Sequence, residues 1–181
     1  MDHVVIPLDS IHAGLVGALA DGLGAAAGIG RALGDMPHLT LVAYSGVERA
    51  AARAAIAAAI SSVPPFVVHA HGYGFFAGHG SGDLNVHVPV VRNEPLAAIH
   101  RVVLDATRNA GAVIAGWTEP DAWTPHITLL SLALDPTVFA TGVTWLATHH
   151  HPSWQIPVDR VVVTGGWTER SATSVPIPLE R

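Results

Sequence analysis

The chain has 181 residues, a length that suggests one domain, or two small lobes that share a core. Half of its residues are apolar and only 13% are charged, which excludes an intrinsically disordered chain. The absence of cysteine excludes disulfides and zinc–cysteine sites, and 14 acidic against 9 basic residues argue against a protein that holds long nucleic acid.

The first predicted elements are a short strand and a helix. Residues 4–8 form the apolar run of a buried strand, and Ser10 is placed to cap the helix that follows. Leu15 and Leu19 lie on one face of that predicted helix. Because glycines are frequent here, we expect the helix to give way to an irregular loop.

The apolar stretch 11–30 has the length of a membrane span but not its character. His12 and Asp21 interrupt it, Gly and Ala make up most of it, and no Arg precedes it. A spanning helix needs stronger hydrophobicity, and a signal peptide needs a basic start. We therefore predict a soluble segment, no membrane association and a cytoplasmic location.

The next elements complete the first half of the chain. Residues 38–44 alternate with the period of a strand. The sequence SGVE at 45–48 has the pattern of a capping box, which predicts an alanine-rich helix to about Ile60. Strands are predicted over 66–76 and 84–91, with a Gly-rich loop between them that makes a hairpin.

The second half repeats this plan after a helix for which Asn93 is the predicted cap. A strand at 126–134 is followed by Asp-Pro, a cap with proline at the first helical position, and by a helix to about Thr148. Two further strands are predicted at 156–164 and 174–179.

Counted from its own histidine, each half therefore has the order strand, helix, strand, strand at similar offsets. Such a duplication predicts an α+β fold with two antiparallel-rich sheets related by a pseudo-twofold axis. We expect a single domain over 1–181. One lobe covers about 30–92, and the other covers about 120–181 together with the N-terminal strand.

Two similar pentapeptides, PHLTL and PHITL, occupy matching places in the two halves. Each sets a histidine and a threonine two positions apart in a strand, so both side chains face the same way, roughly 7 Å apart along the backbone. A duplicated fold brings two such pairs face to face across its axis. The sequence therefore predicts that one small volume receives the side chains of His38, Thr40, His126 and Thr128.

That set of groups suits displacement at phosphorus. Two histidines with a pKa of about 6.5 can exist as one base and one acid at neutral pH. The base activates the attacking oxygen, the acid protonates the leaving oxygen, and the threonine hydroxyls donate to the non-bridging oxygens. Because these groups suffice, we predict no metal ion and no cofactor.

The motifs HLTL at 38–41 and HITL at 126–129 resemble the signature of the 2H phosphoesterase superfamily, two His-x-Thr-x motifs with x usually apolar. The resemblance covers nearly the whole chain, including an ending like the closing hairpin of that family. It implies a bilobal fold with the motifs on central strands that line a cleft and with helices packed outside. It also implies an RNA 2′,3′-cyclic phosphodiesterase or 2′-5′ RNA ligase type of enzyme, since ligation is the same chemistry run backwards. By the same resemblance His38 protonates the leaving oxygen and His126 activates water, or the reverse.

One departure from the family pattern bears on the substrate. Members of the RNA-ligase type often carry Arg just after a motif, whereas Val42 and Leu130 stand two positions beyond the threonines here. This favours a small nucleotide or an RNA terminus with a cyclic phosphate, its base stacked on an aromatic side chain such as Tyr44 or Phe76. The competing interpretation places these aromatics in the core or at the rim of the cleft.

Other histidines suggest a rival kind of site. His69 and His71 lie on one face of a predicted strand, which favours a pair on the solvent side or at the rim of the cleft. With His87 in the neighbouring strand they also have metal-ligand spacing, although no carboxylate is paired with them. The tract 149–151 ends a helix before a proline, which favours a solvated turn. A non-catalytic module that binds a nucleotide or RNA in the same cleft is the alternative from another class. We expect neither a DNA duplex nor a membrane as partner, and we favour a monomer.

Overall fold

The computed structural model of the chain describes residues 1–29, 36–77, 83–133, 136–165 and 176–180. Its class is α+β with antiparallel pairing between strands, as predicted. The described part of the chain contains a short 3-10 helix, η1 (Gly116–Thr118), and four α-helices: α1 (Ser10–Ala26), α2 (Arg49–Ile60), α3 (Glu94–Asn109) and α4 (Pro136–Thr148).

Most of the described strands belong to one sheet. Its order is β10-β9-β1-β2-β7-β5-β4, with β6 attached to β2, and a separate pair is formed by β3 and β8. The two predicted sheets are thus the two sides of one sheet, joined where β2 meets β7. The bounds are β1 (Asp2–Pro7), β2 (His38–Ser45), β3 (Phe66–His71), β4 (Gly74–Ala77), β5 (Asp83–Pro89), β6 (Val113–Ile114), β7 (His126–Ala133), β8 (Ser153–Val158), β9 (Arg160–Gly165) and β10 (Ile177–Pro178).

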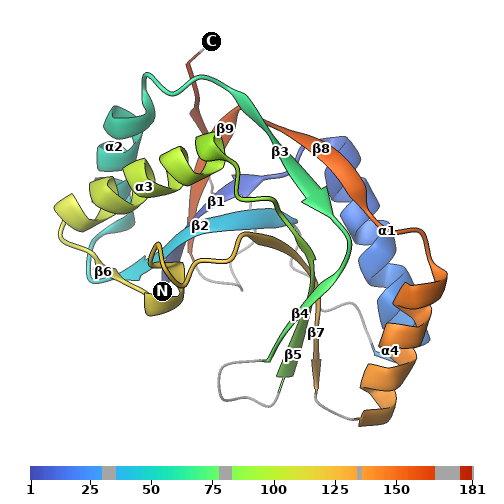
Figure 1. The fold of residues 1–181 in the computed structure, drawn as a ribbon. Helices are drawn as coiled ribbons and strands as arrows, with labels where there is room; N and C mark the ends of the chain where they lie inside the picture. The colour runs from blue at the N-terminus through green and yellow to red at the C-terminus, as the bar shows by residue number, and fades with distance from the viewer. Residues whose placement is uncertain (30–35, 78–82, 134–135, 166–175, 181) are drawn as a thin grey trace.

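The two sides of this sheet each draw on both halves of the chain. β1 pairs with β2, which carries the first motif, and with β9 from the predicted second lobe, so the N-terminal strand lies between strands of the two predicted lobes. β5 in turn pairs with β7 of the second motif. The helices cross as well, because α1 packs against β7 and α4 whereas α3 packs against β2 and α2. Figure 1 shows α2 and α3 on one side of the molecule and α1 and α4 on the other.

Equivalent strands confirm the internal repeat in detail. In both β1–β2 and β5–β7 a proline is opposite the motif histidine, and a β-bulge follows the pair that contains the motif threonine. The amides of Leu8 and Val90 donate to the carbonyls of Pro37 and Pro125, the residues before the two histidines, at 3.2 and 3.0 Å. The repeating unit therefore begins one strand before the motif, with β1 in the first half and β5 in the second.

Side-chain caps explain where some helices begin. Asn93 caps α3 by accepting a hydrogen bond from a first-turn amide, as predicted. Asp9, rather than Ser10, caps α1, because its carboxylate accepts from two first-turn amides. α2 starts at Arg49 without a side-chain cap, so the capping box predicted at 45–48 is not formed.

Two of the predicted strands are each divided into two. The stretch 66–76 breaks at Gly72, whose φ of 71° favours glycine, and only its second part, β4, pairs with β5. The stretch 156–164 is likewise divided between β8 and β9. Some predicted features lie outside the described residues: the hairpin loop at 78–82, the cap at Asp135 and the first part of the strand at 174–179.

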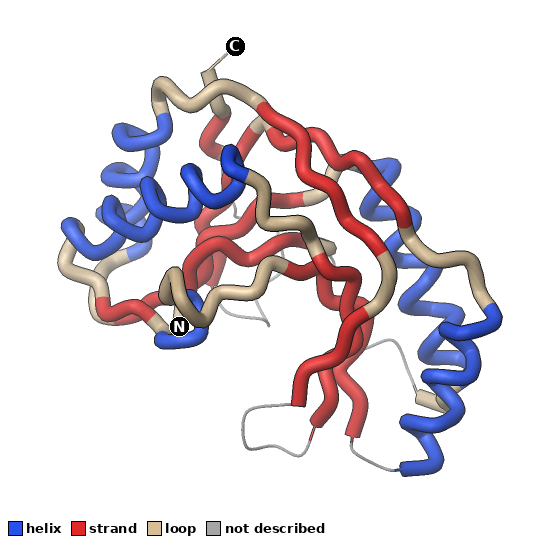
Figure 2. The backbone as a smooth tube through the Cα atoms, viewed as in Figure 1, coloured by secondary structure: helices blue, strands red, loops and turns tan. Residues whose placement is uncertain are grey.

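The core lies between the central strands and the helices on both sides of them (Figure 2). α1 turns Val16, Ala20 and Leu23 inward, whereas Leu15 is 42% exposed, so its buried face differs from the predicted one. The reason is that α1 packs against both β7 and α4, and this packing decides which side is covered. Within the part of the chain that is described, no helix has both the length and the hydropathy to span a membrane.

Candidate active site

The two motifs lie on the adjoining strands β2 and β7. These strands are antiparallel and in register at Leu39 and Ile127, so each motif histidine lies opposite the threonine of the other motif. Leu39 and Ile127 are fully buried on one face, and side chains alternate along a strand, so the motif side chains share the other face. Directly opposite side chains have Cβ atoms about 5 Å apart. The structure thus brings together all four predicted catalytic residues: His38, Thr40, His126 and Thr128.

Both imidazole rings are held in the same way. Nδ1 of His38 lies 2.8 Å from the carbonyl oxygen of Met36, and Nδ1 of His126 lies 2.8 Å from that of Thr124. A carbonyl oxygen can only accept, so Nδ1 carries the hydrogen and donates it in each ring. Nε2 is therefore the nitrogen of both half-buried rings that carries no hydrogen when the ring is neutral.

The electrostatics of the two rings are coupled. Burial lowers the pKa of both His38 and His126 below the ordinary value, against the opposing effect of the hydrogen bonds to the backbone. The charge of protonated His126 lowers the pKa of His38 further. Protonating one ring therefore makes it harder to protonate the other, which favours one acid and one base in the pair.

The second motif has polar support from β5 that the sequence analysis missed. Nδ2 of Asn85 donates to Oγ1 of Thr128 at 3.2 Å, and Nδ1 of His87 lies 3.2 Å from Oδ1 of Asn85. Phe76 stacks on His87 with ring centroids 4.0 Å apart and stands nearly perpendicular to His126 at 4.9 Å. The sequence signal for this support was the spacing of Asn85 and His87, which are two positions apart and so share a face of their strand. That strand was predicted in the first lobe.

Each motif histidine interacts electrostatically with a second, buried histidine. His3 on β1 has its pKa lowered to about 4 by burial first and then by the charge of His38. His87 has its pKa lowered to about 4 by burial first and then by the charge of His126. Both rings are neutral at pH 7, so they add no charge near the motif histidines.

Trp123 ties the two motifs together. Its Nε1 donates to the backbone carbonyl of Thr40 at 2.9 Å, although Trp123 lies only three positions before the second motif histidine. The indole is 4% exposed and lies flat on the ring of His100, with centroids 3.9 Å apart. Through this hydrogen bond, Trp123 links the segment that precedes β7 to the strand β2.

The two aromatic residues predicted to bind a base are placed differently. Phe76 is partly exposed and lies against His126, in agreement with a position beside the motifs. Tyr44 is fully buried, and burial raises the pKa of its phenol to about 12. Tyr44 therefore offers no face on which a base could stack, because the packing of β2 beyond the motif places it in the core.

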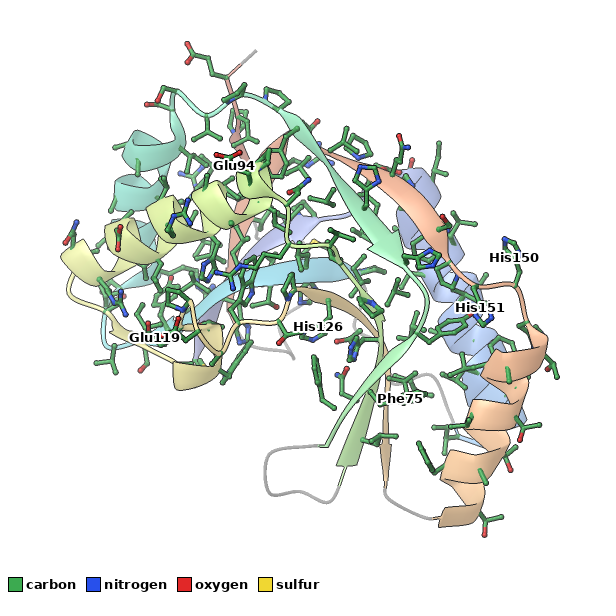
Figure 3. All side chains as sticks on the ribbon, viewed as in Figure 1. Phe75, Glu94, Glu119, His126, His150 and His151 are labelled. Atoms are coloured by element: carbon green, nitrogen blue, oxygen red, sulfur yellow. The ribbon has the colours of Figure 1, made fainter. Side chains whose placement is uncertain are left out.

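The rival histidine cluster is not assembled. His69 and His71 are exposed on β3, which pairs with β8, whereas His87 is buried on β5. Among the residues that the structure describes, no group of three His, Cys, Asp or Glu side chains is arranged to hold a metal ion. The tract 149–151 is exposed after α4, as expected, and Figure 3 shows His150 and His151 at the edge of the molecule, far from the central His126.

A duplicated α+β fold with a His-x-Thr pair from each half defines the class of the two-histidine phosphoesterases. The sequence profile of the 2′-5′ RNA ligase superfamily matches residues 7–165, and the chain belongs to that superfamily. Membership supports phosphodiesterase-type activity. Comparison with curated proteins gives no match.

Solved structures share the fold over almost the entire chain. TT0787 of Thermus thermophilus has a TM-score of 0.62 and 16% identity, covering 99% of this chain and 94% of that one. E. coli LigT complexed with 3′-AMP has a TM-score of 0.59 and 18% identity, with 99% and 95% covered. Usb1 of Kluyveromyces marxianus has a TM-score of 0.56 and 11% identity, with 98% and 97% covered. At these identities the likeness is one of fold.

Proposed function

We propose that the chain is a phosphoesterase that opens a 2′,3′-cyclic phosphate, or cleaves another phosphodiester, on a small nucleotide or an RNA end. The observation that carries the proposal is the meeting of two His-Thr pairs across β2 and β7, with both Nδ1 atoms bound to backbone carbonyls. That arrangement presents two Nε2 atoms and two hydroxyls on one face of the sheet. Membership of the superfamily supports the same class of reaction.

In the proposed hydrolysis, a water oxygen forms a bond to phosphorus while Nε2 of one histidine takes the proton of the water. The bond from phosphorus to the leaving oxygen breaks, and that oxygen takes a proton from Nε2 of the other histidine. We assign His126 as the base and His38 as the acid; the exchanged assignment uses the same groups. The hydroxyls of Thr40 and Thr128 donate to the non-bridging oxygens, where charge accumulates. The reaction needs no metal ion or cofactor. Ligation uses the same groups when the hydroxyl of a second RNA end, in place of water, forms the bond to the phosphorus of the cyclic phosphate and one ring oxygen leaves as a protonated hydroxyl.

A compact substrate fits the surroundings of the motifs best. No arginine follows either motif, and Phe76 supplies an aromatic surface beside His126 on which a base can stack. Among the solved structures of the same fold, LigT is complexed with 3′-AMP and Usb1 with uridine monophosphate. These complexes support a small nucleotide, free or at an RNA end, as the substrate class for this chain.

The test is a substrate panel. Purified chain is incubated with 2′,3′-cyclic nucleotides and with short oligonucleotides of 2′-5′ and 3′-5′ linkage, and the products are separated by chromatography. We expect a nucleoside monophosphate or a shortened oligonucleotide from the intact chain, and its formation to be about 10²–10⁴ slower with His38→Ala. Asn109→Ala, at the exposed end of α3, is the matched control and stays active. Binding without any product would favour a non-catalytic module instead.

A further inference from the structure

The paired-histidine reaction leaves two polar side chains on β5 without a role. Asn85 and His87 are two positions apart, and neither belongs to a motif. His87 is 3% exposed and Asn85 is half-buried, so neither is there merely to solvate the surface. A buried polar group persists in a fold where its hydrogen bonds are made.

The directions of the hydrogen bonds follow from what each atom can do. Oδ1 of Asn85 can only accept, so Nδ1 of His87 carries the hydrogen between them. The amide is thereby fixed with Nδ2 toward Thr128, and Nδ2 can only donate. Oγ1 of Thr128 accepts this bond through a lone pair, which leaves its own hydrogen to be donated elsewhere.

The imidazole at the start of this chain of bonds is confined by β4. Gly74 is opposite His87, and a Cβ at Gly74 would collide with Nε2 of the ring and lie 3.1 Å from Cγ of Pro89. Phe76 covers the face of the same ring. The imidazole is therefore held in one orientation, with Nδ1 toward Asn85.

The other half of the repeat has no such pair. Pro7 and Pro89 are equivalent, each opposite a motif histidine. Counting back four and two residues, Asn85 corresponds to His3 and His87 corresponds to Val5. The pattern of an asparagine followed two positions later by a histidine thus occurs beside the second motif, whereas the first has His3 and Val5 in these places, so the duplicated halves differ here.

We infer that Asn85 and His87 are positioning residues that fix the hydroxyl of Thr128 as a hydrogen-bond donor toward a phosphoryl oxygen of the substrate. The inference rests on the proposed function for the identity of the acceptor. It makes the two threonines unequal, because Thr128 is oriented before the substrate arrives. Asn85 and His87 act through Thr128 and do not touch the phosphate.

The tautomer of His87 tests the first link without any need for activity. In ¹⁵N-labelled chain at pH 7, we expect the ring of His87 to carry its hydrogen on Nδ1. Asn85→Ala is expected to weaken that preference without abolishing it, because the backbone of Asn85 also hydrogen-bonds the ring. Gly74→Ala, which forces the ring to move, is expected to have the same effect while leaving Asn85 in place. A hydrogen on Nε2 in the intact chain would overturn the inference.

A double-mutant cycle tests the link to catalysis. With a 2′,3′-cyclic nucleotide we expect Asn85→Ala to lower kcat about 10-fold with little change in KM, the loss of one buried hydrogen bond. In a chain that already carries Thr128→Val, Asn85→Ala is expected to have no further effect, because its target has gone. Asn109→Ala is the control. Losses that multiply in the double variant would show that Asn85 acts independently and would overturn the inference.

A binding experiment separates failure of the proposed function from failure of the positioning role. If the intact chain cleaves no member of the substrate panel, that function is wrong, and the same cycle is measured on the Kd of adenosine 3′-monophosphate by calorimetry. A weakening by Asn85→Ala that disappears in Thr128→Val still supports the positioning role. No weakening, or one that persists in Thr128→Val, overturns it.

Discussion

Lowering the pH from 7.5 to 4.5 is expected to destabilise the folded chain, because His3 and His87 are buried as neutral rings. Burial is the main reason that the pKa of each is lowered from 6.5 to about 4. The unfolded chain binds protons on these rings as the pH falls below 6.5, while the folded chain does not until about pH 4. Stability is therefore complete above pH 6.5 and is lost as the pH falls through that window.

The size of the effect follows from the difference between the two pKa values. One pH unit corresponds to about 1.36 kcal/mol for each proton that only the unfolded state binds. At pH 4.5, two units below the pKa of the free ring, each histidine costs about 2.7 kcal/mol, and the two together cost about 5 kcal/mol. A folded domain has roughly 5–15 kcal/mol of stability in total. The chain is therefore expected to be close to unfolding at pH 4.5.

Urea denaturation followed by tryptophan fluorescence at pH 7.5, 6.5, 5.5 and 4.5 measures this loss. Below pH 6.5 we expect the free energy of unfolding to fall with a slope that corresponds to at least two protons bound only by the unfolded chain. The slope includes more than His3 and His87, since burial lowers the pKa of His38, His100 and His126 as well. His87→Gln is expected to reduce the slope by about one proton, whereas His71→Gln, at an exposed position, serves as the control. A free energy of unfolding that is constant between pH 6.5 and 4.5 would refute the reasoning.

Predictions for the site concern rate, pH, metal ions and packing. In cyclic-nucleotide assays His38→Ala and His126→Ala are each expected to lower kcat by about 10²–10⁴. The double variant is expected to lose less than the product of the two single losses. Replacing either motif threonine by valine is expected to lower kcat by roughly 10²–10³, and His149→Ala is expected to have no measurable effect. The profile of kcat/KM against pH is expected to be bell-shaped on the acid side of the ordinary histidine pKa, because burial lowers the pKa of both rings; a flat profile between pH 5 and 9 counts against the pair. Activity is expected to survive EDTA, and a strict need for added metal would contradict the mechanism. Trp123→Phe leaves the Thr40 carbonyl without its donor and is expected to cost about 2 kcal/mol, a fall in Tm of roughly 4–8 °C; an unchanged Tm would show that this bond is dispensable.

The motif residues could be predicted from the sequence because two local rules coincide. Side chains two apart on a strand share a face, and a duplicated unit places its copies around an axis. His38 and His126 needed only those rules. The cap at Asn93 is equally local, since an asparagine before a helix accepts from a first-turn amide.

The features that the sequence did not predict depend on distant partners. An apolar strand such as β1 fits either side of the sheet equally well, and only the assembled fold decides that it joins β2. A tyrosine in a strand gives the same sequence pattern whether its ring faces a ligand or the core, so the burial of Tyr44 could not be predicted. The contact between Asn85 and Thr128 depends on a register across β5 and β7, and the bulge in that register is invisible to any local pattern.

The crossing of α1 and α3 limits how the molecule can move. α1 leaves β1 on one side of the sheet and packs on the other, and α3 does the reverse from β5 (Figure 1). β3 and β8, one from each repeat, also pair with each other. A hinge between the two sides would have to break these crossed contacts, so the packing opposes a change in the separation of the two histidines. In the proposed reaction, a phosphate group would therefore have to fit the existing separation of the two histidines.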